Sequence, residues 1–188
     1  ITETLTYSAG VVMRSEVPID EEFNANIYNL DTIPSHDIRI ENNEISGFGY
    51  GVVTLGMGIL YKSGEGFNKY MFFPGKNNVI HKNVIHDVAR AGIFVGFEDG
   101  IRVTNNRIFN VNGNFDVPST KGVAGIIAGG DSYEQYYSYF NTNTVIMNNE
   151  ISGVTGSGAV HGIKVENPQL EFPGGLGEFI FFPDQDEN

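Results

Sequence analysis

The chain has 188 residues, of which 40% are hydrophobic and 18% charged, a composition typical of a folded domain with a real core. Its 23 acidic and 11 basic residues give a formal net charge of −12, which argues against nucleic acid as a partner because phosphate binding needs clustered Lys and Arg. No apolar run approaches the ~20 residues of a membrane-spanning helix, so we expect no membrane insertion. The absence of Cys excludes disulfides, thiolate catalysis and Cys-ligated zinc.

The chain starts at Ile1 without Met or a signal peptide. We therefore expect one domain over residues 1–188 that is a mature or excised piece of a longer protein. Abundant Gly, Asn, Ile, Val, Phe and Tyr favour strands joined by tight turns.

One pattern occurs four times along the chain: an aliphatic residue three positions before an Asn, and an Ile two positions after it. The copies cover residues 38–46, 78–86, 101–109 and 144–152, with the shared Asn at 43, 83, 106 and 149. The gaps between these Asn residues are 40, 23 and 43 positions. A spacing of 23 lies in the range of solenoid repeats, and each longer gap fits one repeat plus a loop of about 17 to 20 residues.

A second pattern, Gly followed by Val or Ile, comes after each Asn repeat and opens a short apolar strand. Its copies are Gly51-Val52, Gly92-Ile93, Gly125-Ile126 and Gly162-Ile163, with Gly10-Val11-Val12 as a fifth copy upstream. Gly58-Ile59 competes with Gly51-Val52, and the pattern does not choose between them. Each repeat is thus predicted to run strand, Asn turn, strand, Gly, strand.

The recurrent Asn has a physical explanation in stacked repeats. Asn tolerates the left-handed backbone of a sharp bend, and amides placed above one another can hydrogen-bond up a ladder. Alternate Ile and Val residues, Ile85 and Ile108 among them, would point inward and form a continuous core. The alternative is a β-sandwich, but antiparallel hairpins do not require the same Asn-x-Ile spacing four times. We predict that residues 38–41, 78–81, 101–104 and 144–147 lie in one parallel sheet with the four Asn residues stacked.

These repeats, and the stretch from Asn78 to Val88 above all, resemble the right-handed parallel β-helix proteins of the pectin-lyase-like superfamily over roughly residues 36–166. The resemblance implies an all-β solenoid of about five coils with long aromatic-rich loops on one side. It also implies a polysaccharide partner and an extracellular or cell-surface location. It does not imply one activity, because this fold carries lyases, hydrolases, epimerases, phage tailspikes and adhesins.

Loops inserted at one turn of a solenoid stack on one side. The insert after Ile93 is short, whereas those of the neighbouring repeats are long, which predicts a cleft with Phe97, Glu98 and Asp99 on its floor. Exposed aromatic rings suit sugar faces, unless they fold back and cover the core. The predicted glycan contacts are Tyr61, Tyr70, Tyr136, Tyr137 and Phe97.

The local motifs of the superfamily's enzymes are absent or partial. The segment His161-Gly162-Ile163-Lys164 is a weak echo of the Gly-His-Gly and Arg-Ile-Lys motifs of polygalacturonase-like hydrolases. The Asp-Pro-His of alginate-epimerase-like enzymes and the Arg-x-Pro-x-x-Arg of pectate lyases do not occur. No catalytic residue can therefore be carried over from a known enzyme.

Catalytic candidates then come from placement alone, since one repeat contributes five ionisable side chains: Lys82, His86, Arg90, Glu98 and Asp99. A lyase needs a base and a cation, which the first three could supply. A hydrolase needs two carboxylates about 5 to 9.5 Å apart, but sequence neighbours on a strand point to opposite faces. Ordinary solvated surface charges are the simpler interpretation.

The four His residues show no metal-ligand spacing, and we expect no cofactor. Calcium is the one ion that the acidic runs Asp20-Glu21-Glu22 and Glu98-Asp99 would suit, although neither matches a calcium-loop motif.

Three functions remain open. Aromatic loops and missing enzyme motifs favour a glycan-binding adhesin or targeting segment, with a neutral glycan preferred because the charge of −12 repels polyuronates. The alternatives are a polysaccharide lyase or glycoside hydrolase acting in a cleft over residues 78–108, and a structural spacer of a large surface protein. Because solenoid ends expose unpaired backbone unless capped, we expect another chain or segment to complete them.

Overall fold

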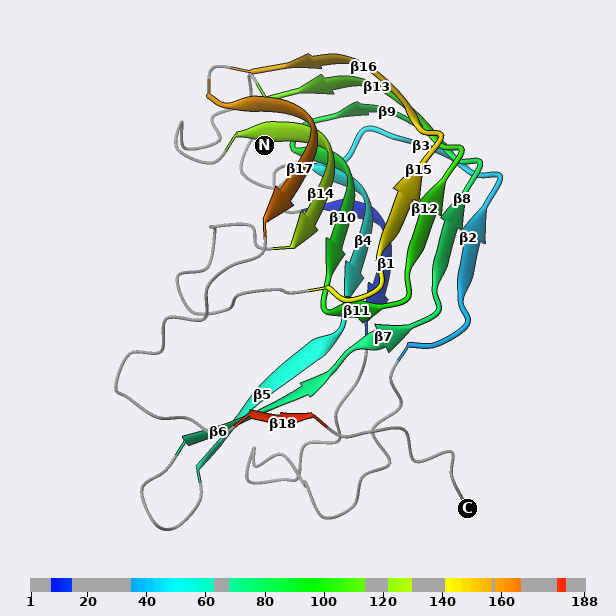
Figure 1. Cartoon of the computed structure of the whole chain (residues 1–188). Coiled ribbons are helices and arrows are strands. Elements are labelled where there is room, and N and C mark those ends of the chain that lie inside the picture. Colours follow the sequence, from blue (N-terminus) through cyan, green and yellow to red (C-terminus); the bar gives the residue numbers. More distant parts are fainter. Residues whose placement is uncertain are drawn as a thin grey trace.

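The computed structural model (Figure 1) describes residues 8–14, 35–62, 68–113, 122–129, 141–156, 158–166 and 179–181. Regular structure in these ranges is all β. No helix that could span a membrane is found in them. The strands are β1 (Ala9–Arg14), β2 (Arg39–Glu41), β3 (Glu44–Ser46), β4 (Tyr50–Leu55), β5 (Met57–Lys62), β6 (Asn68–Phe73), β7 (Gly75–Lys76), β8 (Val79–His81), β9 (Val84–Val88), β10 (Ala91–Gly96), β11 (Glu98–Asp99), β12 (Arg102–Thr104), β13 (Arg107–Asn112), β14 (Val123–Gly129), β15 (Val145–Met147), β16 (Glu150–Thr155), β17 (Val160–Glu166) and β18 (Phe179–Phe181).

Three parallel sheets form most of the structure. Sheet 1 has the order β2-β8-β12-β15, sheet 2 the order β3-β9-β13-β16, and sheet 3 the order β1-β4-β10-β14-β17. The chain visits sheets 1, 2 and 3 in turn and then starts again one strand further along each sheet (Figure 1). We call each such circuit a pass. The predicted parallel sheet is confirmed, because Ile80 aligns with Ile40 on one side and Val103 on the other.

The predicted Asn stack is also confirmed, at the corner between sheets 1 and 2. The backbone N–H and the side-chain amide of Asn83 both donate to Oδ1 of Asn106, each at 3.0 Å. Asn106 repeats this pattern toward Asn149, with both distances at 2.9 Å. Each ladder Asn also donates to a backbone carbonyl, as Asn106 does to Ile80 at 3.0 Å. The ladder therefore satisfies the backbone polar groups of a buried corner.

The left-handed bend at this corner lies one residue earlier than predicted. The ladder Asn residues do not have positive φ angles, whereas the residue before each of them does. These preceding residues are Asn42, Lys82, Asn105 and Asn148, with φ between 52° and 57°. The bend thus occurs just before the ladder and leaves each ladder amide directed along the stack.

The core has matched columns of Gly and Ile. Ile85 and Ile108 are fully buried, as predicted, and each packs against a Gly of sheet 3. A Cβ on Gly92 would lie 2.5 Å from Cγ2 of Ile108 and 2.8 Å from the carbonyl oxygen of Gly125. Gly51 and not Gly58 is the copy in this column, since its neighbour Val52 pairs with Ile93. The Gly pattern therefore marks where the third strand of one pass approaches the second strand of the next pass closely.

The central strands of sheet 3, β10 and β14, are buried on both faces. Every residue of β10 and β14 is buried. Val52, Ile93 and Ile126 belong to the main core, whereas Phe94 and Ile127 belong to a second apolar cluster. Side chains alternate between faces along a strand, so this second cluster lies on the opposite, outer face of sheet 3. The outer face is therefore not an open binding surface at β10 and β14.

The insert after β4 is a β-hairpin. Strands β5 and β6 pair antiparallel, and β18 adds to β6 in parallel (Figure 1). The chain then re-enters the stack through β7, which pairs with β11 of the next pass. The insert that was predicted as a loop over residues 61–76 is thus largely strand. The insert also begins earlier than predicted, at Met57.

Candidate functional site

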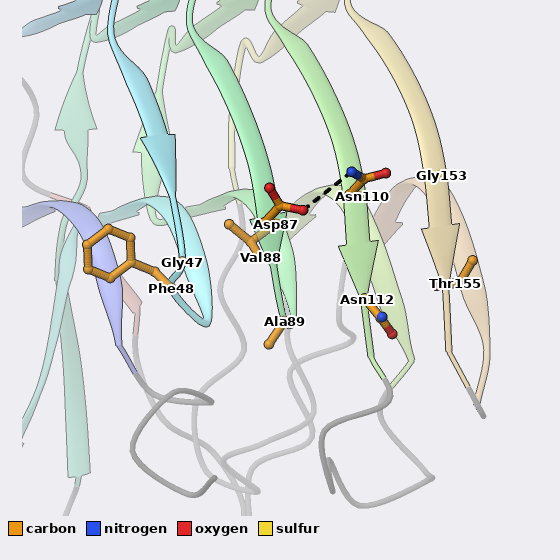
Figure 2. A pocket seen from close by; sticks show the side chains of 9 residues that line it. All are labelled: Gly47, Phe48, Asp87, Val88, Ala89, Asn110, Asn112, Gly153 and Thr155. Carbon is orange, nitrogen blue, oxygen red and sulfur yellow. Dashed lines mark hydrogen bonds between the residues drawn. The ribbon is translucent and has the colours of Figure 1, made fainter. Parts of the chain in front are cut away.

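A groove of about 560 Å³ crosses four successive passes where the strands of sheet 2 run toward sheet 3 (Figure 2). Its lining residues are Gly47, Phe48, Asp87, Val88, Ala89, Asn110, Asn112, Gly153 and Thr155. Val88 and Ala89 are buried, and Asn110, Asn112 and Thr155 are exposed. The groove therefore combines four polar side chains with an apolar surface that includes the partly exposed ring of Phe48.

A second column of left-handed residues produces this concave corner. Gly47, Asp87, Asn110 and Gly153 have φ angles of 81°, 51°, 54° and 60°. Gly adopts this conformation freely, and Asn and Asp are the side chains that tolerate it best. Because each pass bends at the same place, the bends align along the stack and the groove extends across the passes.

Asp87 supplies the negative charge of the groove. Its Oδ1 accepts a hydrogen bond from Nδ2 of Asn110 at 3.3 Å (Figure 2), and its Oδ2 lies 2.6 Å from Nδ1 of His86. The His86 hydrogen bond is the main cause that lowers the pKa of Asp87. The carboxyl is therefore ionised at neutral pH. None of the nine lining residues is basic.

His86 lies beside the groove on the outer face of sheet 2. Its ring stacks on Phe109, with centroids 4.9 Å apart and planes 9° from parallel. Its Nε2 lies 3.2 Å from Oε1 of Glu44, so carboxylates engage both ring nitrogens. These contacts, with the Asp87 hydrogen bond first, raise the pKa of His86. Arg107 lies over the Phe109 ring, 5.0 Å from its centroid, and completes a charged cluster next to the groove.

The five predicted catalytic candidates are distributed around one pass and do not form one cluster. Lys82 is exposed at the Asn corner, and His86 lies on sheet 2. Arg90 is fully buried and donates to the carbonyl oxygen of Gly122. Asp99 accepts hydrogen bonds from Thr142 at 2.7 Å and from Asn143 at 2.8 Å.

Glu98 is buried inside the stack, with 1% of its surface exposed. Its Oε2 accepts a hydrogen bond from Nδ2 of Asn78 at 2.9 Å. Burial raises the pKa of Glu98 to about 7, and the Asn78 hydrogen bond opposes this rise. Glu98 thus points inward and Asp99 does not, as expected for neighbours on a strand.

The predicted glycan contact Phe97 does not fit its position, because its ring is only 3% exposed and cannot stack on a sugar. With Glu98 also buried, these two side chains do not form an open cleft floor. Tyr136 and Tyr137 lie outside the described residues. Tyr61 and Tyr70 lie on strands β5 and β6, and their side chains are outside the described part.

No known protein family, curated protein or solved structure matches this chain. Within the described ranges, no group of three or more His, Asp or Glu side chains is placed to hold a metal ion. The acidic run Asp20-Glu21-Glu22 lies outside those ranges.

Sequence reasoning missed the groove residues Phe48, Asn110, Asn112 and Thr155. A signal for them existed in the repeat. The position four after each ladder Asn holds Gly47, Asp87, Asn110 and Gly153. These residue types share a tolerance of left-handed backbone, so comparing the repeats at this position would have predicted a second aligned bend.

Proposed function

We propose that this chain is a right-handed parallel β-helix of the pectin-lyase-like kind that binds a neutral polysaccharide outside the cell. Circuits through three parallel sheets, the Asn ladder and the Gly column support the fold. The groove supports glycan binding, because it crosses four passes and offers polar groups on three of them.

The groove matches an extended sugar chain in chemistry and in spacing. Carboxylate, amide and hydroxyl groups hydrogen-bond to sugar hydroxyls, and the half-exposed ring of Phe48 can contact sugar C–H groups. Stacked strands repeat every ~4.8 Å. That distance is close to the length of one sugar unit in an extended β-linked chain. A polysaccharide lying along the stack would therefore place about one sugar on each pass.

The charge of the groove favours a neutral glycan over a polyuronate. Asp87 is ionised and none of the lining residues is basic, so a uronate carboxylate would lie near a like charge. The net charge of −12 adds long-range repulsion. Neutral xylans, mannans and glucans avoid both costs. The tyrosines Tyr61, Tyr70, Tyr136 and Tyr137 remain predicted additional contacts.

Binding isotherms on neutral and uronate polymers, with and without calcium, test the proposal. Asn112→Ala and Thr155→Ala should each weaken neutral-glycan binding roughly fivefold, the effect of losing one hydrogen bond of about 1 kcal/mol. Ser152→Ala, an exposed change on the same strand as Thr155 but outside the groove, is the matched control. Tight uronate binding that neither groove variant weakens would refute the proposal.

A further inference from the structure

The last pass of the chain ends all three parallel sheets. Strands β15, β16 and β17 are the terminal members of sheets 1, 2 and 3, and each pairs on one side only within the described residues. The Asn ladder ends at the same level. Each ladder Asn donates to the Asn of the following pass, and this series stops at Asn149. This end of the stack, the β15–β17 face, is therefore formed by the outer edges of the three terminal strands.

The β15–β17 face also exposes residues from columns that are buried elsewhere. Ile163 aligns with Ile126, yet Ile163 is 47% exposed and Ile126 is fully buried. Val165 aligns with Ala128 and is 70% exposed, against 4% for Ala128. A Cβ built on Gly162 meets nothing within 4 Å, whereas the aligned Gly125 is tightly packed. These residues are exposed because no further strand packs on β17 in the described residues, whereas β17 itself covers the aligned residues of β14.

At the opposite end of the stack, formed by β1, β2 and β3, the core side chains are covered. Ile40 and Ile45, the core residues of β2 and β3, are 7% and 6% exposed. Met13, the core residue of β1, is 5% exposed. The two ends therefore differ in the core columns, which are covered at the β1–β3 end and exposed at the β15–β17 face.

We propose that the β15–β17 face binds the same face of a second copy of this chain, giving a dimer with two-fold symmetry. A head-to-tail arrangement would need an open surface at the other end, where the core is already covered. A two-fold contact uses the same patch on both copies and closes after two. Across it, strands of one copy lie antiparallel to those of the other, a pairing that β-edges accept readily.

The size of the face is at the lower limit for a specific dimer. At about 3.3 Å per extended residue, the roughly 20 residues of the last pass enclose a face of several hundred Å². Two such faces bury on the order of 1,000 Å² in total, the lower bound for a specific interface. Burial of Val160, Ile163 and Val165 on both copies would supply the apolar centre of that interface.

The dimer forms against a net charge of −12 on each chain. Added salt screens this long-range repulsion and leaves the apolar contact in place. Association should therefore strengthen as salt concentration rises. An interface held by ion pairs would weaken instead.

Sedimentation velocity and light scattering of the full chain over a wide range of concentrations test this. The expected species has twice the mass of one chain. Val165→Lys should weaken association at least about tenfold, because it buries an unpaired charge in each half of the contact. Val165 is largely exposed in the single chain, so this variant should keep its fold, as circular dichroism would show. Val12→Lys is the control, because Val12 is 59% exposed on β1 at the other end of the stack.

Three results would overturn the proposal. They are a monomer at every concentration, oligomers that grow beyond a dimer, and a dimer that Val165→Lys leaves unchanged. Glycan binding by the groove is measured separately, so failure of one proposal does not decide the other.

Discussion

Oδ1 of Asn83 accepts two hydrogen bonds from Asn43, one from the backbone N–H at 3.1 Å and one from Nδ2 at 3.0 Å. One side-chain oxygen thus accepts hydrogen bonds from both the backbone and the side chain of Asn43 in the preceding pass. Asn83 is itself 1% exposed, and so is Asn106. The ladder therefore supplies several buried polar groups with the hydrogen bonds that water would otherwise make.

We expect Asn106→Ala to lower the free energy of unfolding by roughly 3 kcal/mol. The substitution leaves the N–H and Nδ2 of Asn83 and the carbonyl of Ile80 without their partner in a buried corner. Asn105→Gly is the control, because Asn105 is exposed and Gly accepts its left-handed backbone. Urea denaturation measures both. Equal losses in the two variants would mean that the ladder hydrogen bonds are not the main source of stability at this corner.

The Gly column offers a test in which one substitution has opposite effects at two aligned positions. Gly92→Ala places a methyl group 2.5 Å from Ile108 and should cost roughly 2 kcal/mol or more. Gly162→Ala meets nothing within 4 Å and should leave stability unchanged or slightly increased, since Ala restricts the unfolded chain. Thermal unfolding of the two variants measures both changes in stability. The measurement is made at low protein concentration, where the chain is a monomer. A destabilised Gly162→Ala there would show that another segment already packs on the last pass.

The parts of this fold that were predictable are those that repeat at fixed spacing. The parallel sheet, the stacked Asn residues and the inward Ile85 and Ile108 all follow from one pattern of a few residues. Such local periodicity reports directly which residues share a face. The one-residue error in the bend has a physical reason: Asn suits both a left-handed bend and a ladder, and Asn42-Asn43 places the two side by side.

What the repeat did not predict depends on contacts between distant segments. Loop lengths locate an insert, but whether a neighbouring strand packs over Phe97 and Glu98 depends on tertiary pairing. The choice of Gly51 over Gly58 is likewise made by pairing with β1 and β10. The groove was missed because the residues that line it are individually ordinary polar residues. Only their alignment across passes distinguishes them.

Buried Glu98 should make stability depend on pH. Its pKa is about 7 in the folded chain against 4.5 for an exposed Glu. Between these two pH values, Glu98 in the folded state therefore keeps a proton that it has released in the unfolded state. The resulting stability is fully present below pH 4.5 and is lost as pH rises to about 7, a difference of roughly 3 kcal/mol.

Glu98→Gln imitates the protonated acid and should flatten this slope. Denaturant titrations at a series of pH values measure it. Glu150→Gln, which changes a carboxylate whose side chain is 68% exposed, should leave the slope as it is. A slope unchanged in Glu98→Gln would place its origin elsewhere.

His86 gives the last prediction, because it links the charged cluster to the groove. The Asp87 hydrogen bond is the first cause of its raised pKa, ahead of the contact with Glu44. In an NMR titration we expect His86 to lose its proton above pH 6.5, and Asp87→Asn should return its pKa toward that value. Asn accepts the left-handed backbone of Asp87, so the bend is retained. Because a raised His pKa stabilises the folded state at low pH, this contribution is present below pH 6.5 and is lost as pH rises through the folded pKa. Glu150→Gln again serves as the control, and a His86 pKa that Asp87→Asn leaves unchanged would contradict the assigned cause.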